Sequence, residues 1–115
     1  MKYAFFFVFF GTVIGGPFLS PPTSGAPVTT APRSAAELYS KNCAACHGRD
    51  GRARTSKARR NHARNLGDSE WQNRVSDERI FNSIMNGKGK MPGYAKKLSE
   101  QEIDSLVPYV RGLKK

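Results

Sequence analysis

Cysteine and histidine are scarce in this chain of 115 residues, which contains only two of each. Zinc would need a fourth ligand beside Cys43, Cys46 and His47, and His62 is not at the spacing of an H-x₃₋₅-H motif. No stretch alternates apolar and polar residues long enough to predict a sheet, which excludes the βαβ setting of a thioredoxin-like dithiol. Ser/His/Asp sets, paired carboxylates and phosphate-binding glycine motifs are also missing. We therefore do not expect an enzyme.

Acidic residues are few as well. Asp and Glu number nine against 19 Lys and Arg, which gives a formal net charge of +10. Much of the excess lies in residues 48–64, G-R-D-G-R-A-R-T-S-K-A-R-R-N-H-A-R. A run this basic could bind an anionic membrane, but an acidic partner or a solvated loop is the interpretation that we favour. Because the run lacks interleaved aromatic residues, we do not expect it to bind nucleic acid.

The N-terminus has the pattern of an export signal. One basic residue, Lys2, precedes the apolar run A-F-F-F-V-F-F-G-T-V-I-G-G. This run is shorter than the roughly 20 residues that span a bilayer, and S-G-A at 24–26 has the form of a cleavage site. We expect a signal peptide at residues 1–26 and a periplasmic protein. The alternative is an uncleaved anchor, the only case in which we expect membrane contact. A Pro/Thr-rich linker at 27–33 then leads into a single domain at 34–115.

Helix signals recur along this domain. S-A-A-E at 34–37 is a capping box and predicts a helix that runs through the two cysteines to end at Gly48. A second helix is predicted at 76–86, where apolar residues have helical spacing. S-E-Q-E at 99–102 is another capping box and starts a third helix, in which Pro108 should cause a kink or the loss of a hydrogen bond. The fold class is therefore all-α.

The sequence C-A-A-C-H-G at 43–48 indicates the chemistry. Cys43, Cys46 and His47 stand at i, i+3 and i+4, so a helix would place them on one face. A disulfide across two intervening helical residues would be strained. Covalent haem attachment uses every group of the motif, because the thiols add to two vinyl groups and the imidazole ligates the iron. We expect one haem c with Cys43 and Cys46 as thioethers and His47 as a metal ligand.

The chain resembles the class I cytochromes c of the small bacterial monohaem kind. The resemblance is carried by C-A-A-C-H-G, by N-G-K-G-K-M-P-G-Y at 86–94 and by L-S-E-Q-E-I-D-S-L-V-P-Y-V-R-G-L at 98–113, and it covers nearly all of 34–115. It implies a small cytochrome c fold, with three to four helices wrapped around one covalently attached haem. It also implies that the first and last helices cross. The expected contacts place Leu38 and Tyr39 against Leu106, Tyr109 and Val110.

The second axial ligand has three candidates. Pro92 disfavours a helical conformation for the residue before it, so Met91 should be extended in a glycine-rich loop that lets the backbone approach a flat ring. Met85 has the helical spacing of a core residue. His62 lies in the basic run, where we expect it to be solvated. Met91 is therefore the predicted ligand.

An iron with two axial ligands has no open position for a substrate, so the resemblance implies electron transfer. We expect a monomeric single-electron carrier that cycles haem iron between Fe(II) and Fe(III) for periplasmic or membrane redox partners. One alternative is a fixed electron-transfer subunit of a dehydrogenase or oxidase, and another is a haem-based gas sensor. The resemblance places four lysines around the exposed haem edge, where an acidic redox partner would dock. They are Lys88, Lys90, Lys96 and Lys97.

Overall fold

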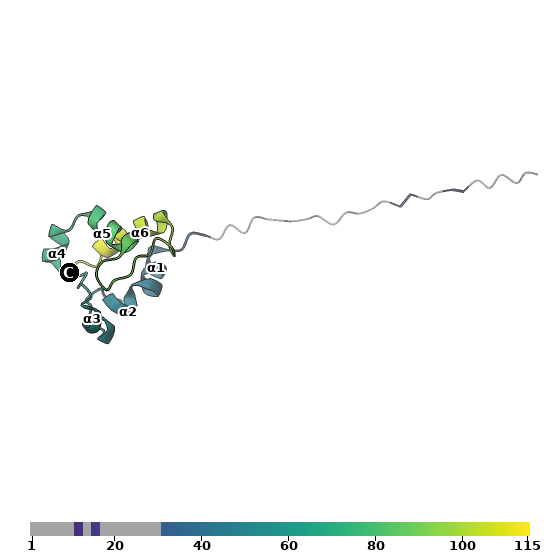
Figure 1. Cartoon of the computed structure of the whole chain (residues 1–115). Helices are drawn as coiled ribbons and strands as arrows, with labels where there is room; N and C mark the ends of the chain where they lie inside the picture. The colour runs from purple at the N-terminus through teal and green to yellow at the C-terminus, as the bar shows by residue number, and fades with distance from the viewer. Residues whose placement is uncertain (1–10, 13–14, 17–30) are drawn as a thin grey trace, which may run out of the picture.

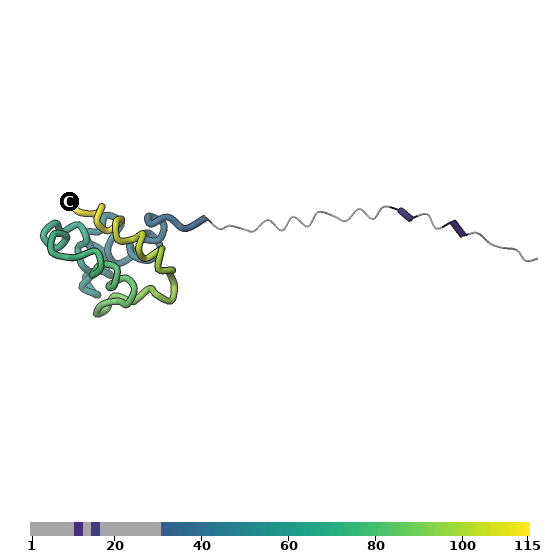
Figure 2. Tube along the Cα trace, turned by 90° about the horizontal axis from the view of Figure 1, so that it is seen from above, coloured from purple at the N-terminus to yellow at the C-terminus, as the bar shows by residue number. Residues whose placement is uncertain are grey.

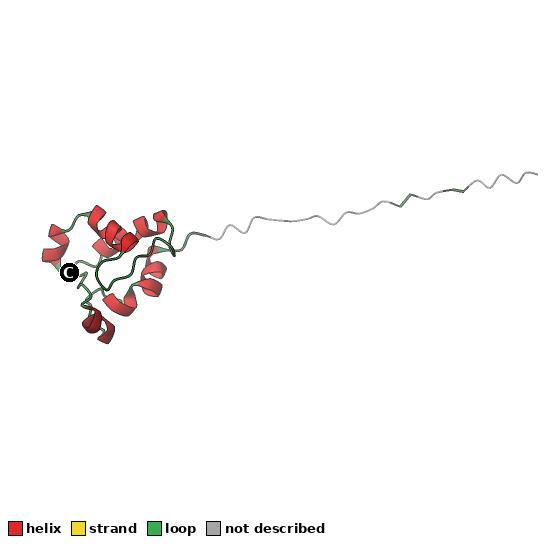
Figure 3. Ribbon diagram, in the orientation of Figure 1, coloured by secondary structure: helices red, strands yellow, loops and turns green. Residues whose placement is uncertain are grey.

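The computed structural model describes residues 11–12, 15–16 and 31–115. All regular structure in these residues is helical apart from one isolated β-bridge, so the all-α class is confirmed (Figure 3). Most of the signal peptide expected at 1–26 lies outside the described residues, and so do residues 27–30 of the linker. No helix in the described part of the chain is long and apolar enough to cross a membrane.

The described domain contains six helices, more than the three to four expected (Figure 1). In chain order they are α1 (Ala35–Asn42), α2 (Ala44–His47), α3 (Ser56–Asn61), α4 (Ser69–Arg74), α5 (Asp77–Asn86) and α6 (Glu100–Arg111). The sequence did not predict α3 and α4, which have six residues each. Helices this short fit no window in which an apolar period can be recognised. The N-cap residues were the one indication of these helices in the sequence. Thr55 and Asp68 accept hydrogen bonds from backbone amides of the first turn of α3 and α4.

Both predicted capping boxes are confirmed. The Ser34 side chain accepts from the amide of Glu37, and the Glu37 carboxylate accepts from the amide of Ser34 at 2.9 Å. Ser99 and Glu102 form the same pair at the start of α6, where the amide of Ser99 lies 3.0 Å from the carboxylate. The helix predicted at 76–86 also begins at its expected cap, where the Ser76 side chain accepts from the amide of Arg79.

The helix predicted through the cysteines is interrupted at Cys43. This residue separates α1 from α2, with φ −114° and ψ −37°. The amides of Cys46 and His47 donate to the Cys43 carbonyl at 3.1 and 2.9 Å. The motif therefore forms a turn of its own that still carries both thiols and the imidazole. Gly48 ends it as predicted, at φ +79°, a conformation that favours glycine.

Helices α1 and α6 pack against each other, and α5 covers another side of α6 (Figure 2). The expected contact residues take part, because Leu38, Tyr39, Leu106 and Val110 are buried in one core cluster. The rings of Tyr39 and Tyr109 lie 4.9 Å apart between centroids. Helices α1 and α6, at the two ends of the domain in sequence, are therefore joined through its core.

Pro108 lies inside α6 without ending it. The helix continues to Arg111, three residues further on. Proline has no N–H, so the carbonyl of Asp104 lacks its helical donor. Asp104 and Pro108 are both exposed, which leaves that carbonyl open to water. The predicted loss of one hydrogen bond therefore falls on the solvent side of the helix, while the buried stripe is preserved.

Candidate functional site

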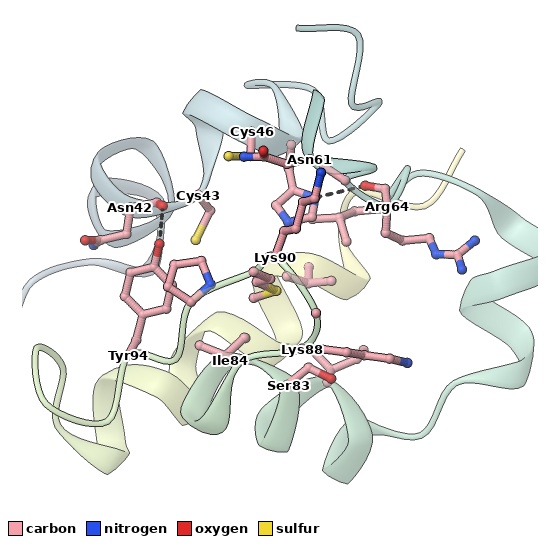
Figure 4. Close-up of a pocket in the computed structure, with 18 of the residues that line it drawn as sticks. Asn42, Cys43, Cys46, Asn61, Arg64, Ser83, Ile84, Lys88, Lys90 and Tyr94 are labelled. Atoms are coloured by element: carbon pink, nitrogen blue, oxygen red, sulfur yellow. Dashed lines mark hydrogen bonds between the residues drawn. The ribbon is translucent and has the colours of Figure 1, made fainter. Parts of the chain in front are cut away.

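The helices enclose a cavity of about 780 Å³. Pockets that take drug-sized ligands and cofactors have volumes of roughly 300–1,000 Å³. Figure 4 shows one wall built from the Cys43–Cys46 turn and its surroundings, and the facing wall built from α5 with Ser83 and Ile84. The lining includes six buried or half-buried aliphatic side chains, Leu66, Val75, Ile80, Ile84, Leu106 and Val110. The cavity is therefore large and apolar enough to hold a flat aromatic cofactor.

Both cysteines line this cavity as free thiols that are partly exposed. Burial, with a smaller contribution from the nearby Cys46, raises the pKa of the Cys43 thiol to about 11. The Cys43 thiol therefore stays protonated at neutral pH, which makes it a poor nucleophile toward oxidants. The hydroxyl of Thr55 donates to the carbonyls of Ala45 and Cys46 at 3.0 and 3.2 Å, and this fixes the turn between the two thiols from outside.

His47 is buried, with 8% of its surface exposed, and it lines the same cavity. Its Nδ1 lies 2.8 Å from the carbonyl oxygen of Arg64 (Figure 4). A carbonyl only accepts, so Nδ1 carries the proton and Nε2 keeps its lone pair. Burial lowers the pKa of this imidazole, against a smaller opposing effect of the hydrogen bond. A neutral imidazole with one nitrogen held by a backbone carbonyl is the usual form of a metal-ligating histidine.

Met91 lies on the cavity wall in a tight turn after α5. The amides and carbonyls of Lys88 and Met91 exchange two hydrogen bonds of 3.0 Å each, with Gly89 between them at φ +58°. Gly87 allows this turn to fold back on itself. A Cβ at Gly87 would lie 2.6 Å from the Met91 carbonyl oxygen, and its φ is +80°. The glycines noted in the sequence are therefore required for the backbone of this loop.

The two other candidates for an axial ligand have different positions. Met85 lies on α5, packs against the core cluster and does not line the cavity. His62 follows α3 at φ +54°, is exposed as expected and also contributes to the lining of the cavity. Of the two methionines, only Met91 faces the space that His47 also faces.

The lining of the cavity carries positive charge and contains no Asp or Glu. Two of the four lysines proposed from the sequence, Lys88 and Lys90, belong to it, whereas Lys96 and Lys97 do not. Lys97 instead lies over the ring of Tyr94, with 5.9 Å from Nζ to the ring centroid. Three exposed cations that the sequence did not single out complete the charged lining. They are Lys57, Arg64 and Arg79.

Sequence reasoning also missed two aromatic residues of the site. Trp71 on α4 lines the cavity, with the Arg64 guanidinium 5.9 Å from its ring. Tyr94 lines the opposite side, and its hydroxyl donates to the Asn42 carbonyl at 2.8 Å. Tyr94 ends the segment 86–94 that carries the resemblance, whereas Trp71 lies in none of the three segments quoted for it. Single aromatic residues carry no spacing that assigns them to a site.

The donors gathered here fit a covalently held haem. Two thiols, one imidazole with a free nitrogen and one thioether meet at a single apolar cavity. The thiols can add to vinyl groups, and the imidazole and thioether are the axial ligands of Met/His cytochromes c. The absence of carboxylates from the lining also favours a group that carries negatively charged propionates.

Comparison with known families agrees with this chemistry. The family model described as cytochrome c oxidase, cbb3-type, subunit III matches residues 30–110. A cytochrome c6 from Bryopsis maxima is 33% identical over 75 residues, which are 65% of this chain and 83% of that protein. The cbb3-type cytochrome c oxidase subunit FixP from Azorhizobium caulinodans is 34% identical over 86 residues. The match covers 74% of this chain but only 28% of FixP, so the chain spans about a quarter of that relative.

Solved structures show the same relationship. The structure titled KustC0563 c-type cytochrome superposes with a TM-score of 0.68 and 40% sequence identity. The match covers 72% of this chain and all of that chain. The aligned part of the fold is therefore that of a complete small c-type cytochrome.

Proposed function

The chain belongs to the cytochrome c family whose model matches residues 30–110, and we propose that within this family it is a freely diffusing single-electron carrier. Its cofactor is one haem c bound through two thioether bonds, and its function is haem electron transfer. We propose three points beyond the family assignment: that the protein diffuses freely, which residues hold the haem, and which surface meets the partner. The observation that carries it is the convergence of Cys43, Cys46, His47 and Met91 on one cavity.

Cys43 and Cys46 are the residues that attach the haem. Each thiol would add across one vinyl group of the haem: the S–H bond and the π bond would be lost, a C–S and a C–H bond would form, and nothing would leave. His47 supplies the first axial ligand through Nε2, because its Nδ1 is engaged by the Arg64 carbonyl. The bound haem supplies a one-electron couple between Fe(III) and Fe(II). The chain holds it in an apolar cavity, which limits water around it.

Met91 supplies the second axial ligand. Its position on the cavity wall, with Met85 outside the lining, supports this choice. A thioether raises the reduction potential relative to a second histidine. Two protein ligands leave no exchangeable position, so the chain has no site at which a substrate could bind the metal. A gas sensor would require Met91 to dissociate readily, and carbon monoxide binding to the reduced wild-type protein at neutral pH would reveal this.

The positively charged side of the cavity is the surface that meets an acidic redox partner. Lys88, Lys96 and Lys97 are exposed and flank Met91 in the chain. Lys57 and Arg79, also exposed, add positive charge to the lining of the same cavity. Clustered charge of one sign steers encounter with an oppositely charged protein. A haem held in this cavity would exchange electrons with a partner docked against this side.

The cytochrome c6 relatives match over most of their length, which supports a small carrier that acts alone. FixP and CcoP, named as oxidase subunits, support the alternative of a fixed subunit. The proposed location is the periplasm, reached through the signal peptide expected at 1–26. The size of the native particle on gel filtration separates a monomeric carrier from a subunit of a larger complex.

The axial ligands are tested by two methionine substitutions. Met91→Ala should abolish the weak charge-transfer band of the oxidised Met-ligated haem, permit carbon monoxide to bind the reduced protein and lower the potential. Met85→Leu is the matched control, since it nearly conserves volume and should cost less than about 1.5 kcal/mol of stability. The assignment of Met91 is wrong if its replacement preserves the band or if the Met85 substitution removes it.

A further inference from the structure

Two side-chain hydrogen bonds tie the Met91 loop, defined here as residues 87–94, to the wall that carries the cysteines. Lys90 Nζ donates to the carbonyl oxygen of Arg60 at 2.9 Å, across 30 positions of sequence. The Tyr94 hydroxyl donates to the carbonyl oxygen of Asn42 at 2.8 Å, across 52 positions. Arg60 belongs to α3 and Asn42 ends α1, so the two bonds join the loop to two different helices.

The base of the Met91 loop is fixed independently of these bonds. The amide of Gly87 donates to the Ser83 carbonyl at 3.0 Å, and the amide of Tyr94 donates to the carbonyls of Ile84 and Met85 at 2.9 and 3.1 Å. A Cβ at Gly93 would lie 2.7 Å from the carbonyl carbon of Asn86, so the chain also packs closely there. The base of the loop is therefore part of the end of α5.

The tip of the loop, residues 88–91, is held differently. Its backbone hydrogen bonds are the two that Lys88 and Met91 exchange with each other, so they shape the turn without attaching it to another element. Among the described residues, the hydrogen bond from Lys90 to Arg60 is the one that connects this tip to the opposite wall. Figure 4 shows Lys90 between Asn61 on one wall and Lys88 and Ser83 on the other.

The acceptor of this hydrogen bond is well suited to an ammonium group. Arg60 lies in the last turn of α3, where carbonyl groups have no helical donor. A charged donor strengthens a hydrogen bond to such a carbonyl. Lys90 is exposed, so solvent weakens the bond, and its net strength falls in the ordinary range rather than at the strong end.

We propose that Lys90 is a positioning residue that clasps the tip of the Met91 loop to α3 and thereby slows the departure of the Met91 thioether from the haem iron. The inference deepens the proposed function and rests on Met91 as the axial ligand. It also separates Lys90 from the docking lysines. The ammonium of Lys90 is engaged within the chain, whereas Lys88 two residues earlier is exposed and donates no side-chain hydrogen bond to a described residue.

The test compares Lys90→Met with Lys88→Met in the oxidised holoprotein. The two variants lose the same charge from the same turn, but only the first loses the clasp. Cyanide binding to oxidised haem waits for the methionine to leave, so its limiting rate at high cyanide reports the opening of the loop. Lys90→Met should raise this rate roughly 2- to 12-fold, the factor that corresponds to one ordinary net hydrogen bond. Lys88→Met should leave it unchanged, and Lys90→Arg should restore it by keeping a charged donor.

Hydrogen exchange of the Lys88 and Met91 amides gives a readout that does not depend on the axial ligand. Both amides should exchange faster in Lys90→Met than in Lys88→Met. The clasp is refuted if the two variants have equal exchange and equal cyanide rates while Met91→Ala abolishes the charge-transfer band. A Met91→Ala protein that keeps its band would instead refute the proposed ligand, and the amide exchange would still decide whether Lys90 holds the loop.

Discussion

The buried hydroxyl of Tyr39 donates a 2.8 Å hydrogen bond to the carbonyl oxygen of Gly48, the residue that follows His47. The ring of the same tyrosine stacks against Tyr109 on α6. One side chain therefore joins the first helix, the last helix and the end of the haem-binding motif. Burial also raises the pKa of Tyr39 well above its ordinary value, so the hydroxyl remains a donor at neutral pH.

We predict that Tyr39→Phe lowers the free energy of unfolding by about 1 kcal/mol, because the carbonyl of the buried Gly48 loses the hydroxyl that donates to it. Tyr109→Phe is the control, since its hydroxyl donates to no described residue and its ring stays in place. Denaturant titration of the holoproteins measures both changes. Equal stabilities for the two variants would show that the Tyr39 hydrogen bond contributes nothing to the fold.

Docking through the positively charged side predicts a strong dependence on salt. The bimolecular electron-transfer rate with an acidic partner should fall as ionic strength rises, because the screening length shrinks from about 30 Å at 0.01 M to about 10 Å at 0.1 M. Replacing Lys88 and Lys97 by Glu should lower the rate at low salt and flatten this dependence, with the spectrum and potential nearly unchanged. Stopped-flow kinetics over a series of salt concentrations provides the measurement.

Replacement of Arg49 and Arg54 by Glu is the matched control for net charge. Both arginines are exposed and neither lines the cavity. If this pair affects the rate as strongly as Lys88 and Lys97 do, the partner does not dock beside Met91. A rate that is indifferent to salt would contradict electrostatic docking altogether.

The two capping boxes predict a loss of stability in acid. The Ser34 side chain, followed by its amide, lowers the pKa of Glu37, and the Ser99 amide, with Arg33 adding to it, lowers the pKa of Glu102. The pKa of each carboxyl group is lower in the folded protein than its unfolded pKa of 4.5. The ionised carboxylates therefore stabilise the fold fully at pH values above 4.5, and this stabilisation is lost as the pH falls through the folded-state pKa. The free energy of unfolding should therefore decrease as the pH is lowered from about 6 to about 3.

Replacing Glu37 and Glu102 by Gln should lower stability at the upper end of this range and make the pH dependence shallower. Glu78 and Glu100 provide the control pair, because their carboxylates accept no hydrogen bond from a described residue and form no ion pair with one. Chemical denaturation at several pH values measures the slope for each variant. An unchanged slope in the Glu37 and Glu102 variant would exclude the capping carboxylates as its source.

The sequence predicted those parts of the fold that depend on a recurring local motif. Ser34 and Ser99 begin helices because a capping box satisfies two backbone donors wherever it occurs. The short helices α3 and α4 were not predicted, because six residues carry too little apolar pattern to distinguish a helix from a loop. The break at Cys43 was also missed, since the turn formed by the motif depends on backbone contacts and not on residue type.

The site was predictable in part. The spacing of Cys43, Cys46 and His47 restricts what they can bind, and Pro92 restricts the backbone of Met91. The tie between Lys90 and Arg60 joins residues 30 positions apart, so only the tertiary structure shows it. In the same way, the sequence does not distinguish the four lysines from one another. In the structure all four are exposed, but only Lys90 donates a side-chain hydrogen bond to a described residue.

Covalent attachment of the haem through Cys43 and Cys46 is the central claim, and mass spectrometry of the protein made in a bacterium that matures c-type cytochromes tests it most directly. The expected mass is that of the chain plus one haem, the pigment should survive extraction with acidified acetone, and fragments that contain the haem should contain both cysteines. The double Cys→Ser variant should carry no bound haem. A wild-type chain of unmodified mass, or one whose haem washes out with the solvent, would contradict the claim.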